Sequence, residues 1–134
     1  MRLLASCFGL FLSLSAAADA RFDYLLHCGG CHLANGRGAP PEIPTLRNEL
    51  GKIVDSLAGR DYIARVPGSA QAPISDAALA NVLNWILREF NAETLPKDFQ
   101  PMSAEEVGRS RQNILADPLK HRQQLWPTGE NEEY

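Results

Sequence analysis

The most regular hydrophobic pattern of the chain lies in its second half. Six large apolar residues recur at positions i, i+3, i+4, i+7, i+8 and i+11, which places them on one face of a helix. These residues are Leu79, Val82, Leu83, Ile86, Leu87 and Phe90. Ser75 precedes the stripe and belongs to the residue types that favour the N-cap position. The pattern predicts a helix that starts near Ser75, ends near Phe90 and buries one complete face.

Weaker patterns predict three shorter helices before this stripe, at residues 21–31, 47–57 and 61–66. The first offers three apolar side chains for burial: Phe22, Leu25 and Leu26. The second has four apolar residues at spacings of three and four: Leu50, Ile53, Val54 and Leu57. The residues expected to end the second and third helices are Gly59, Pro67 and Gly68.

A further helix is predicted after the stripe, because Ser103 and Glu106 have the spacing of a capping box. It should run to about Leu115 as a surface helix, since its apolar face is thin, and end before the Asp-Pro pair at residues 117–118. The tail that follows, through Trp126 to the end of the chain, is expected to be polar and mobile. No strand pattern is visible, so the sequence predicts an all-α fold.

The amino terminus has the form of an export signal. Arg2 supplies a short positive region, residues 3–14 are apolar, and Ala-Asp-Ala at 18–20 fits the small-x-small rule for cleavage. Cleavage is expected after Ala20, with Ala18 as the alternative. The chain is therefore expected to be exported, and in a bacterium this means to the periplasm, without membrane insertion once the signal is removed.

Length and composition are those of one globular domain with extensions. The chain has 134 residues, of which 45% are hydrophobic and 22% charged. We expect a signal peptide at 1–20, a helical domain at 21–91 and a carboxyl-terminal extension at 92–134. The formal charge of −3 argues against a nucleic-acid partner, because nucleic acids attract basic surfaces.

The chemistry is concentrated at residues 27–32, which read His-Cys-Gly-Gly-Cys-His. They contain Cys-x-x-Cys-His, the sequence to which haem is covalently attached. On one helical turn Cys28, Cys31 and His32 share a face, because positions i, i+3 and i+4 are neighbours. Both thiols can then bond to the vinyl groups of one porphyrin while the imidazole ligates its iron. Haem c, one covalently bound group with its iron, is therefore the predicted cofactor.

Three other interpretations of the motif compete with this one. A zinc site needs four ligands, and outside the export signal the chain has only Cys28 and Cys31, with His27 and His121 and no second Cys pair. A thioredoxin-like redox pair needs a βαβ context that the patterns do not predict. A chance occurrence is disfavoured by the export signal and by the sequence downstream. Haem attachment is the preferred interpretation.

The stretch after the motif resembles class I c-type cytochromes. Residues 32–40 read His-Leu-Ala-Asn-Gly-Arg-Gly-Ala-Pro, and Pro-Thr-Leu follows at 44–46. The resemblance covers residues 22–90. It implies a helical fold around one haem, with the stripe helix packed across the amino-terminal helix. It also implies that the carbonyl of Pro44 accepts a hydrogen bond from the axial His32; the alternative is that this proline is only a loop breaker.

The sixth iron ligand departs from the family. In class I cytochromes it is usually a methionine in the loop before the last core helix, and residues 67–73 contain none. Met102 in the extension is the leading candidate, His121 a weaker one and Gln71 a remote one; a packing role for Met102 or an open site are the alternatives. Trp85 lies beside the stripe. Its indole N–H is expected to donate a hydrogen bond to a haem propionate, or its ring simply to pack against its neighbours.

The resemblance implies a periplasmic carrier of single electrons that is not itself an enzyme. Its expected partners are an electron donor, such as a periplasmic dehydrogenase, and a respiratory acceptor. Two other functions stay open at this point. With an open sixth site the protein could bind a gas or act as a haem-based sensor, and with its extension as a docking element it could be the haem subunit of a larger oxidoreductase.

Overall fold

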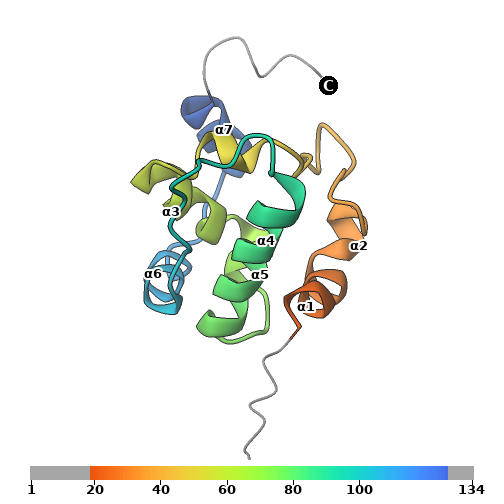
Figure 1. Ribbon diagram of the computed structural model, residues 1–134, viewed down its shortest axis with the longest axis vertical. Coiled ribbons are helices and arrows are strands. Elements are labelled where there is room, and N and C mark those ends of the chain that lie inside the picture. The colour runs from red at the N-terminus through yellow and green to blue at the C-terminus, as the bar shows by residue number, and fades with distance from the viewer. Residues whose placement is uncertain (1–18, 127–134) are drawn as a thin grey trace, which may run out of the picture.

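The computed structural model describes residues 19–126, and within them it contains helices and no β-strand. The elements in chain order are α1 (Ala20–His27), α2 (Gly29–His32), the 3-10 helix η1 (Leu50–Lys52), α3 (Leu57–Arg65), α4 (Pro67–Ala70), α5 (Asp76–Phe90), α6 (Ala104–Ser110) and α7 (Pro118–Leu125) (Figure 1). The all-α prediction is confirmed. Most of the predicted signal peptide, and the tail after Trp126, lie outside the described residues. None of the helices described is long and apolar enough to cross a bilayer.

Helix α5 lies at the centre of the fold, with α1 packed on one side and α6 on the other (Figure 1). Its start is as predicted, because the Ser75 hydroxyl accepts a hydrogen bond from the backbone N–H of Ala78 at 3.2 Å. All six residues of the apolar stripe are buried. Removing such a complete face from water is the main contribution this helix makes to folding.

Helix α1 buries a different side chain from those predicted. Phe22, Leu25 and Leu26 are exposed, whereas Tyr24 is fully buried. The Tyr24 ring packs against both Trp85 and Phe90 of α5, with ring centroids 5.1 and 5.3 Å away. An aromatic ring at this position fills the crossing of the two helices, and this crossing decides which face of α1 is inward.

The predicted helix at residues 47–57 is not formed. Only η1 and turns occupy this stretch, and α3 begins at Leu57 with Ser56 as its N-cap. Leu57 is consequently 84% exposed, although Leu50, Ile53 and Val54 are buried as expected. Gly59 does not end a helix but lies inside α3. A Cβ there would collide with the carbonyl of Ile53, so the close approach of the preceding turn requires glycine.

The turn predicted at residues 61–66 is the second half of α3, and the pair expected to close it starts α4 instead. Proline is well tolerated there, because the first turn of a helix leaves its N–H groups unpaired. Pro67 therefore opens a short helix immediately after another one ends.

The extension packs on the rest of the fold rather than projecting from it. The capping box is confirmed in full between Ser103 and Glu106, although α6 ends at Ser110 and not near Leu115. Val107 and Leu115 are buried in the same apolar cluster as the stripe of α5. Up to Trp126, the prediction of a polar, mobile tail is wrong. Helix α7 forms there, and Trp126 is 3% exposed because it packs edge-on against the ring of Tyr62 at 5.8 Å.

Candidate functional site

The two predicted cysteines and the histidine lie close together in the chain: Cys28 separates α1 from α2, and Cys31 and His32 are the last two residues of α2. Cys28 ends α1 by donating its N–H to the Tyr24 carbonyl at 2.8 Å. Its own carbonyl then accepts from Cys31 at 3.2 Å and from His32 at 2.9 Å. This turn brings the two thiols and the imidazole together within a short stretch of chain. Both cysteines are free; Cys28 and His32 are half-buried and Cys31 is exposed.

The imidazole of His32 is oriented by a backbone carbonyl. Its Nδ1 lies 3.1 Å from the Pro44 oxygen, and because a carbonyl only accepts, Nδ1 is the donor. The other ring nitrogen, Nε2, therefore carries no proton in the neutral form and is the one able to ligate a metal. Burial lowers the pKa of His32, while the hydrogen bond to Pro44 acts in the opposite sense. The neutral ring is favoured.

The loop after His32 is folded so that Pro44 can reach the ring. Gly38 donates its N–H to the His32 carbonyl at 3.0 Å and has a φ of +68°. A Cβ at Gly38 would collide with the carbonyl oxygens of Ile43 and Pro44. Glycine is needed here for both the left-handed backbone and the close approach. The sequence identified this segment as a loop but not as the support of the imidazole.

Tyr24 is a site residue that the sequence analysis missed. Its hydroxyl donates to the Leu33 carbonyl at 2.5 Å, which ties α1 to the residue directly after His32. Burial is the main cause that raises the pKa of Tyr24 to about 12, so the hydroxyl stays protonated. The available signal was its place four residues before Cys28, on the same helical face. Trp85, half-buried beside it, packs against Tyr24, and its predicted propionate contact stays a prediction.

The environment of Cys28 keeps its thiol protonated. Burial first, then electrostatic repulsion from Asp23 and from Cys31, raise the pKa of Cys28 to about 11. Oδ2 of Asp23 is itself buried without a hydrogen-bond partner among the described residues. The group offered at this position at neutral pH is therefore a thiol rather than a reactive thiolate.

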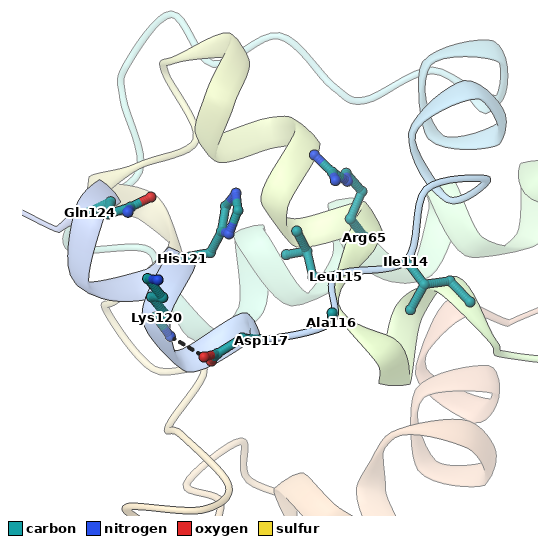
Figure 2. A pocket seen from close by; sticks show the side chains of 8 residues that line it. All are labelled: Arg65, Ile114, Leu115, Ala116, Asp117, Lys120, His121 and Gln124. Carbon is teal, nitrogen blue, oxygen red and sulfur yellow. Dashed lines mark hydrogen bonds between the residues drawn. The ribbon is translucent and has the colours of Figure 1, made fainter.

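The candidates for the sixth ligand lie in three different places. Met102 is 3% exposed in the apolar core, and its backbone is hydrogen-bonded to the side-chain amide of Asn84 on α5. His121 is exposed on α7, where it lines a pocket of about 530 Å³ together with Arg65 and Lys120 (Figure 2). Gln71 is exposed immediately after α4. The assignment of Met102 stays a prediction.

The donor set of the turn fits a covalently held haem. It supplies two free thiols and an imidazole whose Nδ1 is already hydrogen-bonded to Pro44. Apart from its chain neighbours and the backbone of its own helix, no atom lies within 4 Å of where a Cβ on Gly30 would be. Zinc fits less well, because residues 19–126 contain no group of three or more His, Cys, Asp or Glu side chains arranged to hold a metal ion.

A small all-α fold with Cys-x-x-Cys-His at the junction of its first two helices and a histidine oriented by a proline carbonyl defines a c-type cytochrome. No family model matches the chain. One cytochrome c-552 of Thermus thermophilus is 31% identical over 137 residues, covering 82% of this chain and 93% of the relative. A second Thermus thermophilus cytochrome c-552 is 31% identical over 117 residues, covering 69% and 89%. The chain belongs to the class I c-type cytochromes, which carry electrons on a covalently bound haem c.

Proposed function

We propose that this cytochrome is a periplasmic monohaem carrier that shuttles single electrons between a dehydrogenase-type donor and a respiratory acceptor. The observation that carries the proposal is the turn itself, with Cys28 and Cys31 four and one residues before a histidine whose Nδ1 is held by Pro44 at 3.1 Å. The export pattern at residues 1–20 supports the periplasm, and the family supports electron transfer rather than catalysis.

Each residue of the turn has a distinct task in this proposal. Cys28 and Cys31 would anchor the porphyrin through thioethers, and His32 would ligate the iron through Nε2. Pro44 fixes the plane of the imidazole and raises its basicity. When bound, the haem supplies the one-electron iron couple. Tyr24 stiffens the turn, because its hydroxyl holds the carbonyl of Leu33, the residue after His32. The His32 imidazole would therefore move little on electron transfer.

For the other side of the iron, Met102 remains the proposed ligand. The support is elimination, since outside the export signal it is the only methionine and residues 67–73 contain none. A thioether raises the reduction potential relative to a second histidine. The competing role for Met102 is packing, which its 3% exposure supports equally well. His121 and an open site complete the alternatives.

The extension is proposed as a distinct part of the chain from residue 92, but one that shares its core with residues 21–91. Val107, Leu115 and Trp126 belong to the same apolar cluster as α5. A chain truncated after Asn91 would expose this shared surface. We therefore expect it to lose stability, with covalent haem attachment as the measure of whether residues 21–91 still fold.

The test is expression in a host with cytochrome c maturation, followed by intact-mass analysis of protein from the periplasm. The expected mass is the processed chain plus one haem, and acidic organic extraction should leave the haem on the polypeptide. The same mass locates the cleavage. A start at Arg21 is predicted, and a start at Asp19 would retain the N-cap of α1, where the Asp19 carboxylate accepts from the Arg21 N–H at 3.0 Å.

The matched variant replaces both Cys28 and Cys31 with alanine. Covalent haem should then be absent, because no thiol remains to form a thioether. Wild-type protein whose haem is extracted cleanly, or a double variant that retains haem after extraction, contradicts the proposal.

A second function, reversible gas binding at an open sixth site, is favoured by one observation, the absence of methionine from residues 67–73. Absorption spectra of the reduced protein with and without carbon monoxide separate the two functions. A rapid, complete spectral shift supports gas binding. A spectrum that is unaffected, together with electron exchange with redox mediators, supports the carrier.

A further inference from the structure

Leu33, the residue directly after His32, has a backbone conformation that leucine disfavours. Its φ is +62° and its ψ is 161°. This region is occupied almost only by glycine, because a Cβ there crowds the neighbouring peptide groups. The Leu33 side chain is 47% exposed, so its burial does little to offset the conformational cost. Contacts of the Leu33 backbone, rather than of its side chain, therefore have to hold this conformation.

The Leu33 carbonyl accepts two hydrogen bonds. One comes from the Tyr24 hydroxyl at 2.5 Å, and the other comes from the Gly36 N–H at 3.2 Å. Both donors pack against Phe90 of α5. The centroid of the Tyr24 ring lies 5.3 Å from that of Phe90, and a Cβ on Gly36 would lie 2.8 Å from the Phe90 ring. Backbone strain persists where the surrounding structure fixes it, and here the crossing of α1 and α5 supports both donors.

The conformation of Leu33 directs the path of the chain after α2. The loop turns back at once, and the Gly38 N–H donates to the His32 carbonyl at 3.0 Å. Further along the same loop, the Pro44 carbonyl lies 3.1 Å from Nδ1 of His32. With the negative φ that is usual for leucine, the chain would leave α2 in another direction. The same loop would then no longer return to His32, and the imidazole would lose its acceptor.

We propose that Tyr24 is a positioning residue for the axial histidine. Its hydroxyl holds Leu33 in the disfavoured conformation, and that conformation leads the Pro44 carbonyl to the imidazole. The inference rests on the proposed function, in which Nε2 of His32 ligates the iron. The hydrogen bond at Nδ1 makes the imidazole more basic, and a more basic ligand stabilises ferric iron relative to ferrous iron. The Tyr24 hydroxyl therefore keeps the reduction potential lower than it would be with a loosely held ring.

The test uses the haem-loaded, full-length protein, three single variants and two double variants. Tyr24→Phe removes only the hydroxyl and leaves the ring packed against Phe90. Leu33→Gly removes the conformational cost, because glycine adopts a positive φ freely. Leu33→Ala is its matched control, since it shortens the side chain but keeps the Cβ and hence the cost. The double variants combine Tyr24→Phe with each change at Leu33.

Two quantities are measured: hydrogen exchange of the Gly36 and Gly38 amides, and the reduction potential. In Tyr24→Phe we expect exchange of both amides to accelerate about tenfold, because the loop opens more often when Leu33 can relax. The potential should rise, since the hydrogen bond at the imidazole is weakened. The single changes Leu33→Gly and Leu33→Ala should leave the potential at the wild-type value, because the hydroxyl is still present.

The double variants separate the release of strain from the simple loss of a hydrogen bond. In the Leu33→Gly background, Tyr24→Phe should change neither quantity appreciably. In the Leu33→Ala background, its effect should be as large as in the wild type. Equal effects of Tyr24→Phe in the two backgrounds would overturn the proposal. Faster exchange with an unchanged potential would overturn it as well, since Tyr24 would then be structural only.

A folding defect in Tyr24→Phe still gives an answer. Recovery of folded protein by Leu33→Gly but not by Leu33→Ala supports the proposal, whereas recovery by both changes or by neither contradicts it. Failure of the proposed function is recognised separately, by the absence of covalent haem in the wild-type protein.

Discussion

The side-chain amide of Asn84 forms two reciprocal hydrogen bonds with the backbone of Met102. Asn84 Nδ2 donates to the Met102 carbonyl at 2.9 Å, and the Met102 N–H donates to Asn84 Oδ1 at 2.8 Å. Both residues are buried. These bonds hold the segment just before α6 against the middle of α5. They are made by a polar residue that is buried among the apolar residues of α5.

Replacing Asn84 with alanine should destabilise the protein by about 2 kcal/mol, because two buried backbone groups of Met102 lose their partners. Chemical denaturation of the haem-loaded protein measures the effect. Asn81→Ala is the control, since Asn81 is exposed on the same helix and should change the free energy of unfolding by less than about 0.5 kcal/mol. Equal effects of the two substitutions would mean that the pairing contributes nothing to stability.

Met102 can be tested with two substitutions that separate packing from ligation. Met102→Ala leaves a cavity and should cost about 2–5 kcal/mol in either role. Met102→Leu fills nearly the same volume at a cost below about 1.5 kcal/mol, but it removes the sulfur. If Met102 ligates the iron, both variants lose the long-wavelength ferric band of methionine coordination and have a lower reduction potential. A Met102→Leu protein with the wild-type ferric spectrum assigns Met102 to the core alone.

The ion pair between Arg60 and Glu106 should make stability depend on pH. The hydrogen bond from Arg60 is the main cause that lowers the pKa of Glu106 from its ordinary value of 4.5. A carboxylate with a lowered pKa in the folded state stabilises the protein above pH 4.5, and this stabilisation is lost as the pH falls through the lowered value. The substitution Glu106→Gln should therefore lower the free energy of unfolding by about 1–2 kcal/mol near pH 7, and by progressively less as the pH falls.

The control for this prediction is Glu105→Gln on the same turn of α6. Glu105 pairs with Arg109 on the exposed side of the helix, with side-chain exposures of 83% and 68%. Such a pair contributes little in water. Unfolding curves at several pH values should show a pH-dependent difference for Glu106→Gln and none for Glu105→Gln; the same profile for both would contradict the assigned role of Arg60.

Trp126 should be an essential anchor of the extension. Its indole N–H donates to Glu49 at 2.6 Å, and the guanidinium carbon of Arg122 lies 3.9 Å from the centre of its ring. Trp126→Ala should cost about 3–5 kcal/mol. Trp126→Phe retains an aromatic ring but loses the hydrogen bond, so it should cost about 1–3 kcal/mol. Thermal unfolding measures both, and Leu119→Ala on the exposed side of α7 should leave the melting temperature nearly unchanged.

Local signals in the sequence were reliable where one segment contains all the partners of an interaction. The N-cap at Ser75, the capping box of Ser103 and Glu106 and the six buried residues of α5 depend on spacings within a few turns of helix. The turn that carries Cys28, Cys31 and His32 is of the same kind, because its backbone hydrogen bonds join residues within one turn of each other, while the attachment of haem to it stays a prediction. These features could be predicted from composition and spacing alone.

The tertiary structure decided what depends on residues far apart in the chain. The inward face of α1 is set by Tyr24, which packs against Trp85 and Phe90 of α5, and the more apolar residues Phe22, Leu25 and Leu26 are left exposed. The same holds for Trp126, whose contacts with Glu49 and Tyr62 turn a polar-looking tail into helix α7 and buried core.

The physical reason is the same in each case. Spacing along a helix determines which residues share a face, and so the sequence by itself determined the turn at residues 28–32, the all-α class and the central helix. Which of several possible faces is buried, and which carbonyls an arginine such as Arg111 binds 37–41 residues away, depends on the free energy of the assembled core. Only the folded chain brings those groups within contact distance.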